Sequence, residues 1–292
     1  MKKFFFLILS FFFLYDTDSY TPKTNYIEFL SNEIIKHSQL KVDDIIELTK
    51  RAKELNLPIR SKEIIMFLHS AKFNVDKAQR FMTNNYKQRK NLSQFFSTKD
   101  PMSLEMKQVH ETMGFSITLM NNNECHIYAQ LKDTDNSKFN FVSTIRYLFM
   151  VIEYVMITQG TVENIVFTFN ANGIGLFHLN KINMDLAQQL MMFLKGSLPV
   201  RMKGIYIVNS WSFIAKIINS LTSFASSSIK DKVKFVEGEE LKNYTSIDHI
   251  PSEIQGNDKS HVILSEITYK NLCSYRDWYT RKQNIKEEIK HT

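Results

Sequence analysis

The sequence predicts a mixed α/β protein in which a small bundle of helices precedes a mostly parallel β-sheet covered by helices. Three observations support this. The chain has 292 residues, 43% of them hydrophobic, which is enough for two globular units with buried cores. Apolar residues recur at helical spacing before about residue 100. Beyond about residue 110, short β-rich runs alternate with helical stretches.

The amino-terminal segment, residues 1–24, is set apart from this fold. Its apolar run at 4–15 follows two lysines and is shorter than the roughly 20 residues that a spanning helix needs. The run fits a secretory signal peptide that is cleaved after Ser19, because residues 17–19 form a small-x-small pattern. An amphiphilic leader or a misread first exon fits equally well, so these alternatives stay open.

Residues 25–100 are expected to form the helical bundle. Apolar residues recur every three to four positions from Val42 to Leu55, and Pro58 stops the pattern. A second short apolar face covers 64–68, and Asn74 is placed to cap a third helix. We expect the bundle to end at the basic segment 87–90 and a linker to begin at Pro101.

The second half of the chain carries the predicted sheet. Strands are expected at 126–131, 164–169, 204–209 and 232–236, where short apolar runs are bounded by turn-forming residues. Apolar faces at 145–156 and 186–194 predict helices between them, and a last helical stretch covers 264–278 before a charged tail. Alternation of strand and helix favours parallel pairing with helices on the sheet.

Composition and motifs exclude several classes of protein. Cys125 and Cys273 are the only cysteines, so neither a disulfide framework nor a cysteine zinc site is available. The sequence has no G-x-G-x-x-G, G-x-x-x-x-G-K-[ST], H-E-x-x-H or G-x-S-x-G motif. We therefore expect no enzyme, no metal and no cofactor, and interpret His126 and His178 as structural. A net charge of +7 suits an anionic surface but is too dispersed to indicate nucleic acid.

Four segments resemble the CRAL-TRIO family of lipid-binding proteins, which is Sec14-like in fold and includes tocopherol-transfer and retinal-binding carriers. Residues 64–89 are similar to the helical module that precedes the domain, and the run FNANG at 169–173 resembles the family's F-D-x-x-G. LPVRMKGIYIVN at 198–209 resembles P-V-R-x-K-x-I-x-x-I-N, and IPSEIQG at 250–256 is similar to L-P-x-E-Y-G-G. The resemblance implies a helical module at 25–100, a lipid-binding domain at 101–258, and a carboxy-terminal helix and tail at 259–292.

The resemblance also implies a sheet that forms the floor of an apolar pocket, roofed by a mobile lid helix. Residues 211–224 follow the third predicted strand and carry one apolar stripe, so we assign them to the lid. Its expected members include Phe213, Ile214, Ile218 and Phe224. Ordinary core packing is the alternative for each expected lining residue. As lining we expect Leu148, Val151, Ile165, Phe169, Ile174, Phe193, Leu194, Leu198, Ile205, Ile207, Ile217 and Leu221.

A basic surface is the second implied feature. Arg201, Lys203 and Lys232 match positions where phosphoinositide-dependent relatives carry cations. His69, Ala71 and Ser228 stand where such relatives carry basic residues, so general attraction to anionic lipid is better supported than release triggered by phosphoinositide.

The resulting hypothesis is a monomeric, non-enzymatic carrier that is cytoplasmic and associates peripherally with membranes. It would bind a tocopherol-like, retinoid-like or phospholipid-like ligand and exchange it at an anionic membrane surface, where its lid opens. One alternative is a membrane or protein adaptor that has lost cargo transfer. Another is a lipid binder of the secretory pathway, if residues 1–19 are cleaved as a signal peptide.

Overall fold

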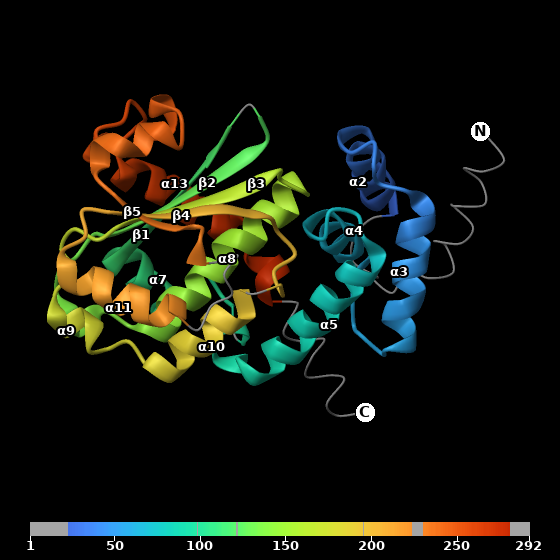
Figure 1. Ribbon diagram of the computed structural model, residues 1–292, viewed down its shortest axis with the longest axis horizontal. Coiled ribbons are helices and arrows are strands. Elements are labelled where there is room, and N and C mark those ends of the chain that lie inside the picture. The colour runs from blue at the N-terminus through green and yellow to red at the C-terminus, as the bar shows by residue number, and fades with distance from the viewer. Residues whose placement is uncertain (1–22, 98, 121, 195, 224–229, 281–292) are drawn as a thin grey trace. The chain divides into compact units, whose positions relative to one another are not determined.

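The computed structural model describes residues 23–280 apart from 98, 121, 195 and 224–229 (Figure 1). The chain divides into two compact units, Met1–Thr83 and Asn84–Thr292. The possible signal peptide and most of the charged tail lie outside the described residues, as do Phe224 and Ser228. The side chain of Leu221 is likewise outside the description.

The first unit contains the three predicted helices and one that was not predicted, α2. α3 places Ile45, Leu48 and Ala52 on one buried face, as its spacing predicts. Asn74 caps the next helix through Oδ1, which accepts a hydrogen bond of 2.8 Å from the backbone amide of Lys77. The helices are α2 (Lys23–Lys36), α3 (Val42–Glu54), α4 (Ser61–Ser70) and α5 (Val75–Asn91), the last of which continues into the second unit.

The second unit is built on a five-stranded sheet in the order β1-β2-β3-β4-β5. β1 pairs antiparallel with β2, and the remaining neighbours pair in parallel. The mostly parallel sheet is therefore confirmed, together with its four predicted strands; β1 is an addition. The strands are β1 (Met113–Leu119), β2 (Glu124–Leu131), β3 (Asn164–Asn170), β4 (Met202–Val208) and β5 (Val233–Val236).

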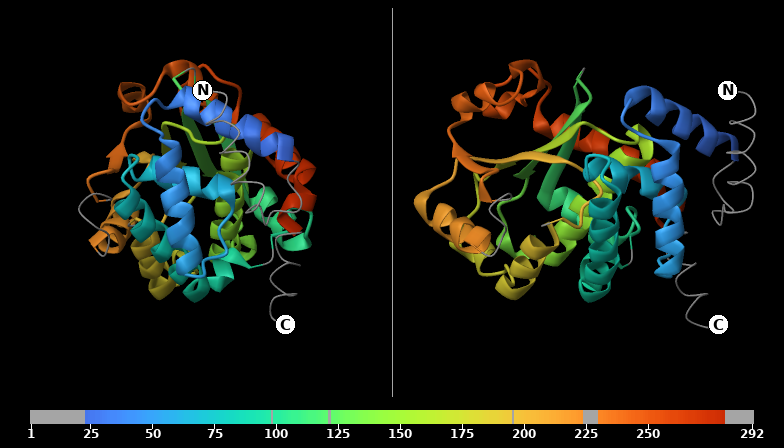
Figure 2. Two further views of the ribbon diagram at one scale, coloured as in Figure 1. Left: turned by 90° about the vertical axis from the view of Figure 1, so that its right-hand side faces the viewer. Right: turned by 45° about the vertical axis from the view of Figure 1, so that its right-hand side comes forward.

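Helices cover one face of this sheet, which we call the inner face (Figure 1, Figure 2). They are α8 (Phe141–Gln159), α10 (Met184–Leu194) and α11 (Ser212–Ser223). Short 3₁₀ turns at Gly238–Asn243, Ile247–His249 and Ser252–Ile254 cover the outer face, where Tyr128, Val166 and Tyr206 are buried with Leu241. Because successive side chains of a strand alternate, the sheet buries apolar residues on both faces.

Three further helices pack around α8 and β1, and a short helix, α9 (Leu176–Leu179), follows β3. α6 (Ser93–Phe96) and α7 (Leu104–Thr112) pack on α8, so the segment after Pro101 is helical where the sequence indicated a linker. The side chain of Ser103 starts α7 by accepting a bond of 3.3 Å from the amide of Met106, a cap that the sequence analysis overlooked. α13 (His261–Ser274) lies along the outer edge of β1, where Thr268 Oγ1 accepts from the amide of Ile117 at 3.3 Å. This contact covers an otherwise open sheet edge.

α8 is the central helix of the second unit. Among the described residues it is the one helix long and apolar enough to cross a membrane, yet 56% of that stretch is buried inside the fold. Its Glu153 is also buried, and one carboxylate oxygen lies 2.7 Å from both Lys99 Nζ and Arg89 Nη2. These contacts identify α8 as a core helix that is joined to its neighbours by a buried charge cluster.

Candidate ligand-binding site

The inner face of β3, β4 and β5 is incompletely covered. Phe167, Phe169, Ile205, Val233 and Phe235 point to this face and pack against the main core cluster, yet each remains only partly buried. On β3 and β4 the neighbours on the outer face, such as Val166, Tyr206 and Val208, are almost fully buried. Side chains on central strands of a parallel sheet, as β3 and β4 are here, normally pack closely on both faces, whereas β5 is the edge strand. The accessible apolar surface is therefore confined to the inner face, where the covering helices do not bury these side chains completely.

The structure brings most of the expected lining residues into one cluster with these five. Several are as deeply buried as ordinary core: Val151, Ile165, Ile174, Phe193, Leu198 and Ile207. Others keep surface that a ligand can contact: Leu148, Phe169, Leu194 and Ile205. Ile217 is half-buried on α11 but does not join the cluster.

α11 occupies the position assigned to the lid. Ile214 is 1% exposed and belongs to the core cluster, whereas Phe213 is 41% exposed. Ile217 and Ile218 are half-buried, and Lys216 between them and Ile214 is exposed. The helix therefore presents one apolar stripe to the inner face, with its polar side outward.

Hydrogen bonds fix the beginning of α11. Asn209 Nδ2 donates to Asn170 Oδ1 at 3.0 Å, and Trp211 Nε1 donates to the carbonyl oxygen of Ile174 at 3.1 Å. Asn170 Nδ2 in turn donates to Gln130 Oε1 at 2.9 Å, so amide side chains connect the ends of β2, β3 and β4. Sequence reasoning assigned no role to these amides. Two of them were nevertheless visible in the family motifs, where Asn170 stands at the aspartate of F-D-x-x-G and Asn209 at the last asparagine of P-V-R-x-K-x-I-x-x-I-N.

The three cations expected at a membrane each have a partner. Arg201 Nη1 lies 2.8 Å from Glu163 Oε1, and Lys203 Nζ lies 2.7 Å from Glu124 Oε1. Lys232 Nζ donates to the carbonyl oxygen of Met202. Burial raises the pKa of Glu124, but the hydrogen bond and charge of Lys203 outweigh it and leave that pKa below its usual value. The cations thus gather at the beginning of β4 and β5, partly neutralised by two carboxylates.

The histidines of the second unit that the sequence analysis singled out occupy hydrogen-bonded structural positions. His126 is 1% exposed and lies between the hydroxyl groups of Tyr128 and Thr245, both at 3.3 Å. Burial lowers the pKa of His126 to about 4. His178 Nδ1 accepts a bond of 3.2 Å from the amide of Gly175, and burial together with Lys181 lowers its pKa.

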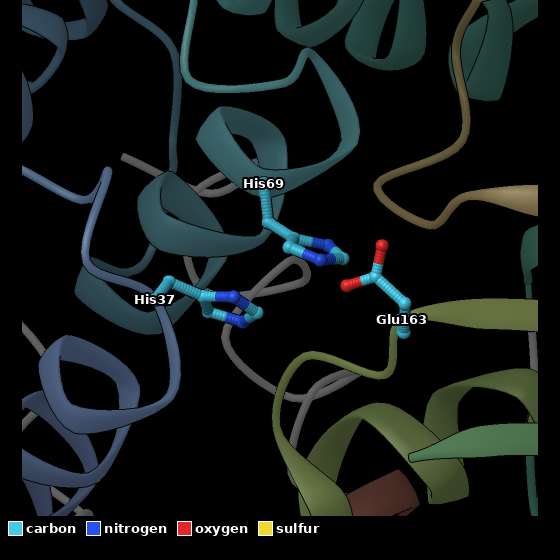
Figure 3. Close-up of side chains that lie close together, drawn as sticks. All are labelled: His37, His69 and Glu163. Carbon is cyan, nitrogen blue, oxygen red and sulfur yellow. The ribbon is translucent and has the colours of Figure 1, made fainter. Parts of the chain in front are cut away.

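The first unit contains a separate histidine pair. The rings of His37 and His69 lie 4.7 Å apart (Figure 3). Both also pack against Phe73. A carboxylate oxygen of Glu33 lies 3.7 Å from His37 Nε2. Glu163, drawn in the same figure, belongs to the second unit, where it pairs with Arg201. Within the first unit the pair is a packing contact between the end of α2 and α4.

A small cavity of about 10 Å³ lies on the outer face of the sheet. Its lining includes Thr168, Asn170, Pro251, Ile254 and His261. This volume holds about one water molecule, so the cavity is too small for a lipid.

Two family models match the chain. Residues 113–256 match the CRAL/TRIO domain, and residues 34–106 match the Pinta-like UBA domain. The first match contains the whole sheet and α8 to α11.

Curated relatives lead to the same family. The chain is 22% identical over 198 residues to the alpha-tocopherol transfer protein-like proteins of Homo sapiens and Pongo abelii, covering 66% of this chain and 57% of theirs. The Mus musculus protein of the same name is 24% identical over 184 residues, covering 62% and 52%. The chain thus spans about half the length of the curated relatives it matches.

A solved structure, described as the crystal structure of Sfh5, aligns with a TM-score of 0.43 and 12% identity, covering 65% of this chain and 70% of that chain. The classification rests on the matched domain model, the curated relatives and the P-V-R-x-K segment, which leads into β4. On this evidence the chain is a CRAL-TRIO protein whose CRAL-TRIO domain spans residues 113–256.

Proposed function

We propose that this protein binds a small hydrophobic ligand of the tocopherol, retinoid or phospholipid kind and carries it between membranes. The ligand would lie in an apolar hollow between the inner face of β3–β5 and helices α10 and α11. The observation that carries this proposal is the partial accessibility of Phe167, Phe169 and Ile205 on β3 and β4, whose outer-face side chains are buried. Val233 and Phe235 of the edge strand β5 continue this accessible surface.

Binding of this kind needs no reactive group. Each CH₂ group of a ligand that moves out of water into an apolar wall contributes about 0.8 kcal/mol. The side chains proposed to form the wall are aliphatic or aromatic. We therefore propose a non-catalytic role, in which the shape of the hollow and its exclusion of water determine which ligand binds.

Ligand exchange requires the wall to open, and α11 is the element suited to move. Its first residues are held by the bonds of Asn209 and Trp211, whereas Ile217 and Ile218 further along are only half-buried. We propose that α11 pivots about residues 209–211. In the open position its apolar stripe would enter the interfacial zone of a bilayer.

Arg201, Lys203 and Lys232 would strengthen attachment to an anionic membrane by about 1 kcal/mol each if they were unopposed. Glu163 and Glu124 offset two of these charges. General electrostatic attraction is therefore favoured over a specific phosphoinositide site. We place the protein in the cytoplasm as a peripheral, monomeric carrier, with the secretory pathway as the alternative if residues 1–19 are removed.

The proposal is tested by incubating the full chain with vesicles that contain phosphatidylcholine, phosphatidylinositol and α-tocopherol, and then measuring retained lipid by native mass spectrometry. We expect one retained lipid per chain. The variant I217D/L221D should retain and transfer far less, because carboxylates would replace two apolar residues of the stripe assigned to the lid. N219D adds a carboxylate to the exposed side of the same helix and should behave as wild type. Absence of retained lipid from every mixture would refute the proposal.

The adaptor function is the second candidate, and the close packing of residues such as Val151 and Phe193 favours it. An adaptor would bind vesicles without extracting lipid. It would also keep that binding in I217D/L221D, because its attachment would not depend on an apolar lid.

A further inference from the structure

A buried carboxylate and two histidines lie together in the first unit. Glu33 and His69 are each 1% exposed, and His37 is partly buried. His37 follows α2 directly, and its amide continues the helix by donating to the carbonyl oxygen of Glu33 at 3.0 Å. Residues four positions apart on a helix share one face, so Glu33 and His37 point the same way. His69 comes from the last turn of α4, which packs on α2.

The distances among these side chains suit shared binding of one metal ion. The ring centroids of His37 and His69 lie 4.7 Å apart, and a nitrogen of one ring lies within 4.8 Å of a nitrogen of the other (Figure 3). A zinc ion bound to both rings with tetrahedral geometry would hold their centroids about 5 Å apart. Glu33 Oε2 lies 3.7 Å from His37 Nε2, and ligand atoms around tetrahedral zinc are about 3.3 Å apart. Small side-chain shifts therefore suffice to bring the three ligands onto one ion.

Lys36 orients the carboxylate of Glu33. Its Nζ lies 3.2 Å from Oε1, while the other oxygen, Oε2, is the one near His37. Carboxylates that bind metals are themselves commonly held by such a partner. The Lys36 side chain keeps 33% of its surface exposed, so water screens its charge. The negative charge of Glu33 can therefore offset part of the charge of a bound cation.

Phe73 holds the two histidine rings in place. Its ring lies 5.5 Å from that of His37 and 5.9 Å from that of His69. Lys72 and Phe73 have φ values of 57° and 59°, a left-handed conformation that is unusual for a phenylalanine. The amide of Phe73 donates to the carbonyl oxygen of Leu68 at 2.7 Å, which fixes this turn at the end of α4. An apolar side chain in this place limits the access of water to the histidines and their rotation.

We propose that Glu33, His37 and His69 bind one divalent transition metal ion, such as Zn²⁺, with water as the fourth ligand. Two imidazoles and one carboxylate form a known zinc ligand set, whereas Mg²⁺ and Ca²⁺ prefer sites made of oxygen atoms. The 10% of the His37 side chain that is exposed gives the ion a route from solvent.

The ion would connect α2 to α4 and so stabilise the first unit, a role that is independent of lipid carriage. The expectation of no metal rested on motifs of neighbouring residues, whereas His37 and His69 come from different parts of the chain. Only the packing of α2 on α4 brings them together.

The test measures Zn²⁺ binding to the full chain, purified without a histidine tag, by isothermal titration calorimetry. We expect one equivalent to bind at this site. His37→Gln and Glu33→Gln should each lower the affinity about 100-fold, since even the partners of metal ligands contribute about 10- to 100-fold. Glu28→Gln is the matched control, because it removes an exposed carboxylate from the same helix and should bind as wild type. Co²⁺ should give the strong visible absorption of a tetrahedral complex.

Wild-type affinity in both His37→Gln and Glu33→Gln would overturn the site and leave the histidine pair as a packing contact. So would a wild-type chain that binds no Zn²⁺, or a Co²⁺ spectrum with only weak octahedral bands. Circular dichroism of each variant separates the loss of a ligand from misfolding. Thermal unfolding gives an independent result: Zn²⁺ should raise the midpoint of the wild-type chain but not that of Glu33→Gln. Equal shifts in the two proteins would contradict the proposal.

Discussion

The side-chain amide of Asn209 donates a hydrogen bond of 3.0 Å to Oδ1 of Asn170, which ties the chain at the start of α11 to the end of β3. Asn209 has a φ of 53°, a left-handed conformation that asparagine tolerates better than most residues. Asn170 Oδ1 also accepts from the amide of Asn172 at 3.1 Å. One side chain therefore organises the pivot that the carrier function requires.

We expect Asn170→Ala to lower the free energy of unfolding by about 1–3 kcal/mol, because the amides of Gln130 and Asn209 lose a buried partner. Asn170→Asp is the matched control. The carboxylate still accepts from Asn209 and Asn172, and rotation of the Gln130 amide restores the third bond, so stability should change by less than about 1 kcal/mol. Urea titration measures both values; equal losses would contradict this role.

Glu153 should be more important for stability than an exposed acidic residue of the same unit. Glu153→Gln removes the negative charge between Lys99 and Arg89, and we expect a loss of about 3 kcal/mol. Asp133→Asn weakens the exposed pair with Lys138 and should change the denaturation midpoint only slightly. Thermal unfolding of both variants gives the comparison, and equal midpoints would show that the buried cluster is not a stabilising feature.

Stability should fall in mild acid because of His126. Its folded pKa of about 4 lies below the unfolded value of about 6.5, so only the unfolded chain takes up the proton between these values. The folded state therefore keeps full stability above about pH 6.5 and loses up to about 3 kcal/mol as the pH falls to about 4. Burial lowers the pKa of His261 as well, which adds to the trend. Urea titrations from pH 8 to 4 should show a flatter profile for His126→Gln; an unchanged slope would exclude His126 as the cause.

Ile214 and Ile217 should respond differently although both lie on α11. Ile214→Ala empties a core position that is 1% exposed, and we expect a loss of about 2–4 kcal/mol. Ile217→Ala affects a half-buried side chain outside the core cluster and should cost about 1 kcal/mol or less, while lipid retention falls. Denaturation and native mass spectrometry on the same samples test this. Equal destabilisation would mean that Ile217 is core instead of lid.

The sequence was sufficient for β2 to β5 because buried parallel strands form continuous apolar runs. It was not sufficient for β1, where Gly114 and Ser116 interrupt the pattern. That strand is fixed by its pairing with β2 and by close packing against His261. The packing is so close that a Cβ atom added at Gly114 would lie only 2.7 Å from His261 Nε2. Tertiary contacts of this kind leave no periodic pattern of apolar residues in the sequence, so a strand that depends on them is not predicted from it.

The candidate site shows the same limit. Ile165 and Phe169 lie on the same strand and face, yet Ile165 is fully buried and Phe169 is not. Core and ligand walls use the same residue types, so periodicity identifies the inner face but not which side chains keep accessible surface. The Asn170–Asn209 contact joins two strand ends that are far apart in sequence, and only the folded sheet brings them together.

The most direct test of the central claim locates the ligand inside the protein. The full chain is loaded with a phosphatidylcholine that carries a diazirine on its acyl chain, irradiated, digested and analysed by mass spectrometry. We predict cross-links on peptides that contain Phe169, Ile205 and Phe235, and protection of these sites by excess α-tocopherol. Cross-links confined to exposed residues such as Phe177, with none on β3 to β5, would contradict the account.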